Sequence, residues 1–132
     1  KGNADSSIPE YSFHWTGRSK YLLLFEAPID MLSFISMHKK NWQQHSYAAA
    51  CSVSDRVLFQ MLKDNPNISE VFLCMDSDEP GQTAAKRISD KLFTQGINAK
   101  ILVPEHKDWN EDLLALNQEE SEVEEPCQVL QL

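Results

Sequence analysis

The sequence predicts an α/β domain with three α/β/α layers and a mainly parallel four-stranded sheet. Two observations lead to this fold class. Short apolar runs alternate four times with helix-like segments, the pattern of strand–helix units joined by parallel crossovers. Acidic residues follow two of those runs directly, at the strand ends where sheets of this class bind ligands.

The first unit begins with "YLLLF" over 21–25, a short apolar run typical of a strand buried on both faces. Pro28 then suits the first turn of a helix. One face of this helix is expected to carry Ile29, Leu32 and Ile35 or Ser36. The aromatic stretch 11–17, which precedes the unit, is expected to form an extended piece at the edge of the sheet.

The second and third units repeat the pattern. A strand of small residues is expected over 46–52, followed by a helix with Ser54 as its N-cap. The third strand is expected over 68–75, and the helix after it is expected to stop at Gly96.

The last unit has a strand over 98–104 and a helix for which Asp108 and Glu111 form a capping-box pattern. We expect an N-terminal extended segment over 1–20, one folded domain over 21–117 and an acidic, poorly ordered tail over 118–132.

The net charge of −8 includes five acids in the tail segment 117–126, so the rest of the chain carries only −3. No basic stretch is present of the kind that binds nucleic acid by itself, and this chain alone is expected to bind DNA weakly. No apolar run approaches a membrane span, and the three cysteines form no C-x-x-C pair. These features predict a cytoplasmic location without membrane contact.

Glu26 follows the first strand, and Asp76 and Asp78 follow the third. If these strands are neighbours, in the order 2-1-3-4, the three carboxylates meet and repel one another unless a cation neutralises them. Mg²⁺, or Mn²⁺ in its place, prefers such oxygen ligands. Gly81 permits a tight turn, and the helix after it offers amides to a phosphate. The alternative is that Asp78 or Glu79 only caps that helix.

Two stretches carry a family resemblance. "LLLFEAPIDMLSF" over 22–34 and "VFLCMDSDEPGQTAAKRI" over 71–88 resemble the two signature motifs of the Toprim domain of topoisomerases, bacterial primases and related nucleases. The segment "HKDWNEDL" over 106–113 resembles a primase-side motif. The sequence of these motifs is most similar to Toprim-like domains of bacterial mobile-element proteins. In those proteins a zinc-binding module commonly lies upstream.

The resemblance implies a Rossmann-like Toprim fold and Mg²⁺-dependent phosphoryl chemistry on DNA or RNA within a longer protein. It implies Glu26, Asp76 and Asp78 as catalytic residues and metal ligands. It further implies Asp30 and Lys107, with Gly81, as candidate contacts to the metal shell or to phosphate. Surface roles for Asp30 and Lys107, and a helix cap for Asp108, are the alternatives.

One position departs from the family pattern, because Ala27 stands where a glycine is usual. This substitution leaves open a domain that holds metal without catalysis and serves as an assembly module. A phospho-receiver domain also has acids at strand ends, but its paired acids follow the first strand. A dehalogenase-type phosphatase carries its D-x-D on the first strand with a long chain beyond. The sequence does not separate primase, nuclease and topoisomerase chemistry.

Overall fold

The computed structural model describes residues 13–50 and 55–119. Its five-stranded sheet has the order β1-β3-β2-β4-β5. The strands are β1 (His14–Trp15), β2 (Tyr21–Phe25), β3 (Ser46–Ala49), β4 (Glu70–Cys74) and β5 (Asn98–Ile101). The last four run parallel, and β1 pairs antiparallel with β3. The predicted order of the four main strands is confirmed.

The strand count is one higher than predicted, because two residues of the aromatic stretch pair with β3 as a short edge strand. His14 lies opposite Ala48 and Trp15 opposite Tyr47. A strand of two residues is too short to leave a period in the sequence, so only an extended edge piece was predictable.

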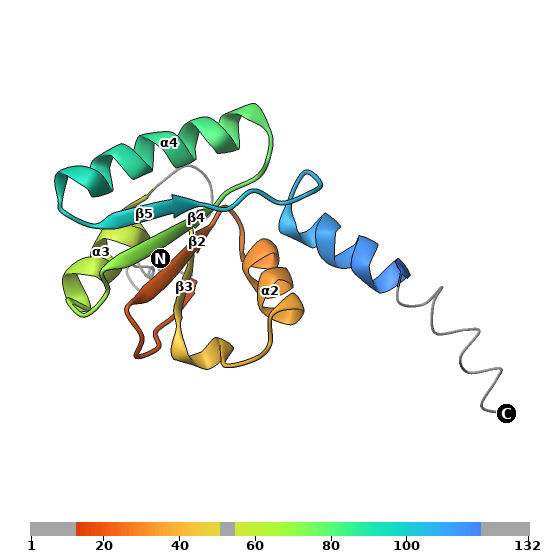
Figure 1. Cartoon of the computed structure of the whole chain (residues 1–132), viewed down its shortest axis with the longest axis horizontal. Helices are drawn as coiled ribbons and strands as arrows, with labels where there is room; N and C mark the ends of the chain where they lie inside the picture. Colours follow the sequence, from red (N-terminus) through yellow and green to blue (C-terminus); the bar gives the residue numbers. More distant parts are fainter. Residues whose placement is uncertain (1–12, 51–54, 120–132) are drawn as a thin grey trace, which may run out of the picture.

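The helices are α2 (Pro28–Met37), α3 (Arg56–Asp64) and α4 (Glu79–Thr94), with a short 3₁₀ turn η2 (Trp42–Gln44). A further helix, the C-terminal helix, occupies 109–119 and extends away from the sheet (Figure 1). Gly96 follows α4 with a φ of 75°, a left-handed conformation that suits glycine and confirms the predicted stop. The predicted cap Ser54 lies outside the described residues. No helix in 13–50 or 55–119 is long and apolar enough to cross a membrane.

The two faces of the sheet have different cores. Helices α3 and α4 cover one face and α2 covers part of the other (Figure 1). The α3/α4 face is largely aliphatic, and its fully buried side chains include Leu22, Leu24, Leu58, Leu73 and Ile88. The α2 face is rich in aromatic rings, which include Phe25, Tyr47, Phe34, Phe72 and Trp109. Alternate residues of each strand therefore serve different layers, as the pleat requires.

The orientation of α2 differs from the prediction. Ile29 and Leu32 are 57% and 52% exposed, whereas Asp30, Met31 and Ser33 are buried. Ile29 and Leu32 of the expected stripe therefore face outward, and Ile35 packs against the core together with Met31 and Phe34. A backbone amide of the C-terminal helix binds Asp30, and Ser33 also contacts that helix, so a polar seam holds α2 in this rotation.

Candidate metal centre

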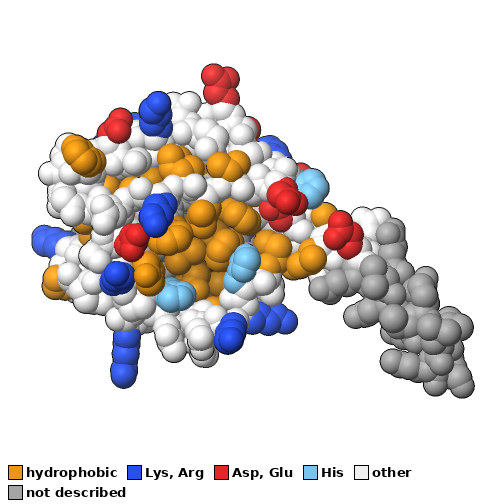
Figure 2. Space-filling model, in the orientation of Figure 1, with side chains coloured by type: hydrophobic (Ala, Val, Ile, Leu, Met, Phe, Trp, Pro, Cys, Tyr) orange, Lys and Arg blue, Asp and Glu red, His pale blue; other side chains and the backbone are white. Residues whose placement is uncertain are grey.

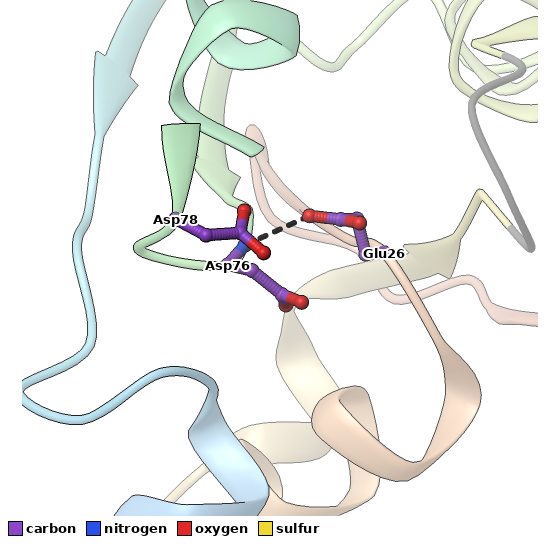
Figure 3. Close-up of side chains that lie close together, drawn as sticks. All are labelled: Glu26, Asp76 and Asp78. Carbon is purple, nitrogen blue, oxygen red and sulfur yellow. Dashed lines mark hydrogen bonds between the residues drawn. The ribbon is translucent and has the colours of Figure 1, made fainter. Parts of the chain in front are cut away.

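Three carboxylates meet where β2 and β4 end side by side. Glu26 follows β2, and Asp76 and Asp78 belong to the turn between β4 and α4 (Figure 3). Each offers an oxygen, and these three oxygens all lie within 4.8 Å of one another. The predicted convergence is confirmed, because β2 and β4 are direct parallel neighbours.

The two turns are joined by the chain itself. The backbone amide of Asp76 donates a hydrogen bond of 3.0 Å to Oε1 of Glu26. Gly81 lies against this contact. A Cβ at that position would lie 2.4 Å from the carbonyl oxygen of Asp76 and 2.8 Å from Oε1 of Glu26. Only glycine lets α4 start this close to the acids, so Gly81 allows the close approach.

Asp78 has a second role at this turn. It is the N-cap of α4, and its Oδ1 accepts a hydrogen bond of 2.9 Å from the amide of Gly81. The cap that the sequence offered as an alternative is therefore present together with the carboxylate cluster. Because this amide is taken by the cap, it is not available to a phosphate.

Of the three acids, Asp76 has a buried carboxylate oxygen that no hydrogen-bond donor of the described residues contacts. This oxygen, Oδ1, is the one such side-chain atom in the part of the chain that the structure describes. Burial raises the pKa of Asp76 to about 7, with further contributions from the carboxylates of Glu26, Asp30, Asp108 and Asp78. A buried acceptor without a donor is costly unless another group binds it.

The donor set fits a hard divalent cation. Within residues 13–50 and 55–119 no salt bridge reaches any of the three acids. Carboxylate oxygens are the ligands that Mg²⁺ and Mn²⁺ prefer, and the uncompensated Oδ1 of Asp76 offers one of them. The fit rests on charge, ligand type and proximity in this structure.

A comparison against protein families agrees with this fold. The Toprim-like family matches residues 23–113, which is more than half of the chain. The chain belongs to the Toprim-like family. The matched span contains Glu26, Asp76 and Asp78 and ends inside the C-terminal helix.

Solved structures give the same fold. The primase fragment of the bacteriophage T7 primase-helicase protein is 22% identical, with a TM-score of 0.57 over 84% of this chain and 44% of that chain. A structure of the T7 lagging-strand DNA polymerase interacting with primase domains bound to an RNA/DNA hybrid and dTTP contains a chain that is 23% identical. Its TM-score is 0.54 over 84% of this chain and 54% of that chain. This Toprim domain thus spans about half of those chains, and no curated protein matches it.

Ala27 does not distort the Toprim turn. Its φ and ψ are −140° and 153°, an extended conformation that any residue adopts. Its carbonyl accepts the amides of Asp30 and Met31 as α2 begins, at 3.1 and 3.2 Å. The usual glycine is therefore not needed here for backbone geometry.

Asp30 lies close to the three acids but is hydrogen-bonded to another element. It is buried, and its Oδ1 accepts a hydrogen bond of 3.3 Å from the amide of Asn110. Burial raises the pKa of Asp30, the bond from Asn110 opposes this rise, and the charges of Asp108 and Glu26 add to it. Asp30 links α2 to the C-terminal helix, which a surface acid would not do.

Lys107 and Asp108 lie in the loop before the C-terminal helix. Asp108 accepts the amide of Glu111 at 2.9 Å, so the predicted helix cap is confirmed. The carboxylate of Glu111 accepts the amide of Lys107 at 3.3 Å. The Lys107 side chain is exposed, and its carbonyl accepts the amide of Ser77 at 2.8 Å.

Sequence reasoning missed the residues that hold the D-x-D turn. The Ser77 hydroxyl donates to the carbonyl of His106 at 2.8 Å, and the Gln82 amide donates to the carbonyl of Asp76 at 2.8 Å. The Trp109 indole donates to the carbonyl of Cys74 at 3.0 Å. In turn, Asp112 accepts both the amide and the ring nitrogen of His106. The one signal in the sequence was the proximity of these residues to the recognised motifs.

Proposed function

We propose that this Toprim domain binds Mg²⁺ or Mn²⁺ through Glu26, Asp76 and Asp78 and carries out phosphoryl transfer on nucleic acid as part of a longer protein. The observation that carries the proposal is the meeting of three carboxylates with no cationic side chain among the described residues to balance them. The uncompensated Oδ1 of Asp76 supports it independently.

The three acids contribute to the proposed site from two different turns. Asp76 and Asp78 present oxygens from one turn, and Glu26 presents its carboxylate from the other. One oxygen of Glu26 is occupied by the amide of Asp76, so its position is fixed whether it acts as a ligand or as a general acid–base group. When bound, the ion supplies charge stabilisation to a phosphate and orients its oxygens.

Primase-like nucleotidyl transfer is the leading form of this proposal. The two solved structures described above contain primase domains, and one holds an RNA/DNA hybrid and dTTP. Nucleotidyl transfer breaks the phosphoanhydride bond of a nucleoside triphosphate, forms a phosphodiester and releases pyrophosphate. Cleavage of nuclease or topoisomerase type would use the same acids to break a P–O bond of an existing phosphodiester. The net charge of −8 favours a longer protein in which an upstream zinc-binding or basic region grips the nucleic acid.

The test uses the full-length parent protein with a single-stranded DNA template, ribonucleotides and Mn²⁺, and a parallel assay of plasmid nicking. Glu26→Gln and the pair Asp76→Asn with Asp78→Asn should lower the active reaction by about 10²–10³-fold, the usual range for groups acting in the transition state. Asp55→Asn, which removes an acid bound by Lys91 and Arg87, is the matched control and should keep activity.

Metal-dependent activity that survives loss of both aspartates would contradict the proposal. Metal binding by these acids in a full-length protein that lacks both activities would instead support the assembly-module alternative.

A further inference from the structure

The half of the α2 face that α2 leaves uncovered contains a pocket that the metal centre does not use. Figure 2 shows hydrophobic side chains at the bottom of a hollow, with histidine and lysine side chains around it. The hollow measures about 360 Å³, within the range of small-ligand pockets. A parallel sheet is normally covered on both faces, and within residues 13–50 and 55–119 no helix covers this apolar floor, which is therefore a candidate binding surface.

The floor of the pocket is aromatic. Tyr21, Phe72 and Tyr47 come from three neighbouring strands, and Phe34 comes from α2. The rings of Tyr21 and Phe72 cross at 89° with centroids 5.8 Å apart. A flat ligand stacked on one of these rings would meet the edge of the other, and both arrangements are favourable for aromatic groups.

The rim of the pocket is basic, although the chain is acidic overall. Lys40 and Lys100 line it, and Lys20 lies 5.5 Å from the ring centroid of Tyr21. These lysines come from separate segments, so no basic stretch in the sequence revealed them. Glu70 is the one acid of the lining. Its side chain is 16% exposed, and its Oε2 lies 3.5 Å from the ammonium of Lys100, which is 65% exposed. Because solvent screens the ammonium of Lys100, this pair is weak and Lys100 is able to contact another anion.

Two histidines complete the rim. The Nδ1 atom of His45 is 2.8 Å from the hydroxyl of Ser19, which holds the ring beside Tyr21. His38 stacks near Phe34 with centroids 4.3 Å apart and is exposed. The pocket therefore offers flat apolar surfaces at its base and hydrogen-bond donors and positive charge at its edge.

We infer that this pocket binds one nucleotide unit, with the base against Tyr21 and Phe72 and the phosphate at Lys40 and Lys100. A planar ring that carries an anion satisfies both features, as in the stacking platforms of single-strand binding proteins. The charge of the rim favours this occupant over an apolar protein segment. The inference does not depend on the metal centre, because none of the pocket residues is among the three acids.

Calorimetric titration of the 132-residue chain in EDTA tests the inference without any contribution from metal. AMP should bind at least about tenfold more tightly than either adenosine or ribose 5-phosphate, because each of these lacks one of the two contacts. Lys40→Glu should weaken AMP binding by about tenfold or more, since it reverses a charge at the rim. Lys86→Glu, an exposed reversal on α4, is the control and should leave AMP binding unchanged.

Two further measurements complete the test. Tyr21→Leu keeps apolar bulk but removes a ring, and should weaken AMP while leaving ribose 5-phosphate binding unchanged; a melting curve checks its fold. Single-stranded oligoadenylate is then compared with AMP. If the oligonucleotide binds more tightly, and Lys40→Glu weakens its binding, the bound nucleotide is part of a strand. Equal affinities for oligoadenylate and AMP identify a free nucleotide as the ligand. Absence of saturable AMP binding, or equal AMP binding by Lys40→Glu and Lys86→Glu, would overturn the inference and indicate that another protein segment covers this face.

Discussion

Two groups of acids on this molecule are neutralised in different ways. Asp55, before α3, lies 3.0 Å from the ammonium of Lys91 and 3.3 Å from the guanidinium of Arg87, both on α4. Burial alone would raise the pKa of Asp55, but Lys91 and Arg87 lower it below the ordinary value. The cluster of Glu26, Asp76 and Asp78 has no such partners among the described residues, and the pKa of Asp76 rises to about 7.

The difference indicates that Asp55 stabilises the fold and that the cluster of Glu26, Asp76 and Asp78 is a candidate ligand-binding site. Where an acid joins two helices, the chain provides its own cations. At the strand ends it brings three carboxylates together, buries one oxygen and offers only backbone amides in return. Ionisable groups with unbalanced burial and charge gather at functional sites, and this contrast inside one small domain follows that rule.

The largest effect on this comparison is expected from Gly81→Ala. The added Cβ would lie 2.4 Å from a backbone oxygen of Asp76 and 2.8 Å from Oε1 of Glu26, so the acidic turn must shift. We expect a loss of about 1–3 kcal/mol in the free energy of unfolding, the usual cost of overpacking, and loss of stabilisation by Mn²⁺. Urea unfolding with and without metal measures both.

Gly96→Ala is the matched control for Gly81→Ala. It has open space around it but a φ of 75°, so it should cost up to about 1 kcal/mol through backbone strain alone. Stabilisation by Mn²⁺ should be intact in this variant. Equal retention of the metal effect in both variants would show that α4 need not start close to the acids.

The two acid groups should respond to pH in opposite directions. The pKa of Asp76 is about 7 in the folded protein and near 3.8 in the unfolded chain, so between these values the folded state holds more protons. Without metal, its contribution to stability therefore falls as pH rises from about 4 to 7. The pKa of Asp55 is lowered, so its contribution is present above pH 3.8 and is lost as pH falls through its folded pKa.

Melting temperatures measured in EDTA from pH 3 to 8 test this contrast. Asp76→Asn should flatten the decline between about pH 4 and 7, and Asp55→Asn should remove stability only at the higher pH values. A decline between pH 4 and 7 that is the same in wild type and Asp76→Asn would assign it to other groups.

The smallest effect is expected at Ser77. Ser77→Ala removes the hydroxyl that donates to the carbonyl of His106, and should cost about 0.5–1.5 kcal/mol. Because this bond holds the D-x-D turn against the loop before the C-terminal helix, Mn²⁺ affinity should also fall. Ser89→Ala, in α4 about two turns beyond Gln82, provides the comparison by calorimetry. No change in Mn²⁺ affinity would show that the turn is held well enough by its backbone contacts.

The sequence predicted the parts of the site that depend on local pattern. Apolar runs located the four parallel strands, and the acids directly after two of them predicted the meeting of Glu26, Asp76 and Asp78. Contacts between distant segments were not predictable. The bond from Ser77 to His106 joins residues 29 positions apart, and neither residue signals the other.

The rotation of α2 was mispredicted for a related reason. Apolar residues usually face inward, but Ile29 and Leu32 face outward because Asp30 and Ser33 bind the C-terminal helix. The apolar face that packs inward is formed by Met31, Phe34 and Ile35, and the polar seam lies beside it. The basic rim of the pocket was also not predicted, because its lysines lie far apart in the sequence.

Binding of a divalent ion by the strand-end acids is tested most directly by Mn²⁺ titration monitored by thermal melting. Three proteins are compared: wild type, Asp76→Asn with Asp78→Asn, and Asp55→Asn. At ten times the dissociation constant, the ion should stabilise the wild type and Asp55→Asn by about 1.4 kcal/mol, a shift of several degrees. The double variant should gain little. Equal shifts in all three proteins would place the metal elsewhere and leave these acids as parts of a helix cap.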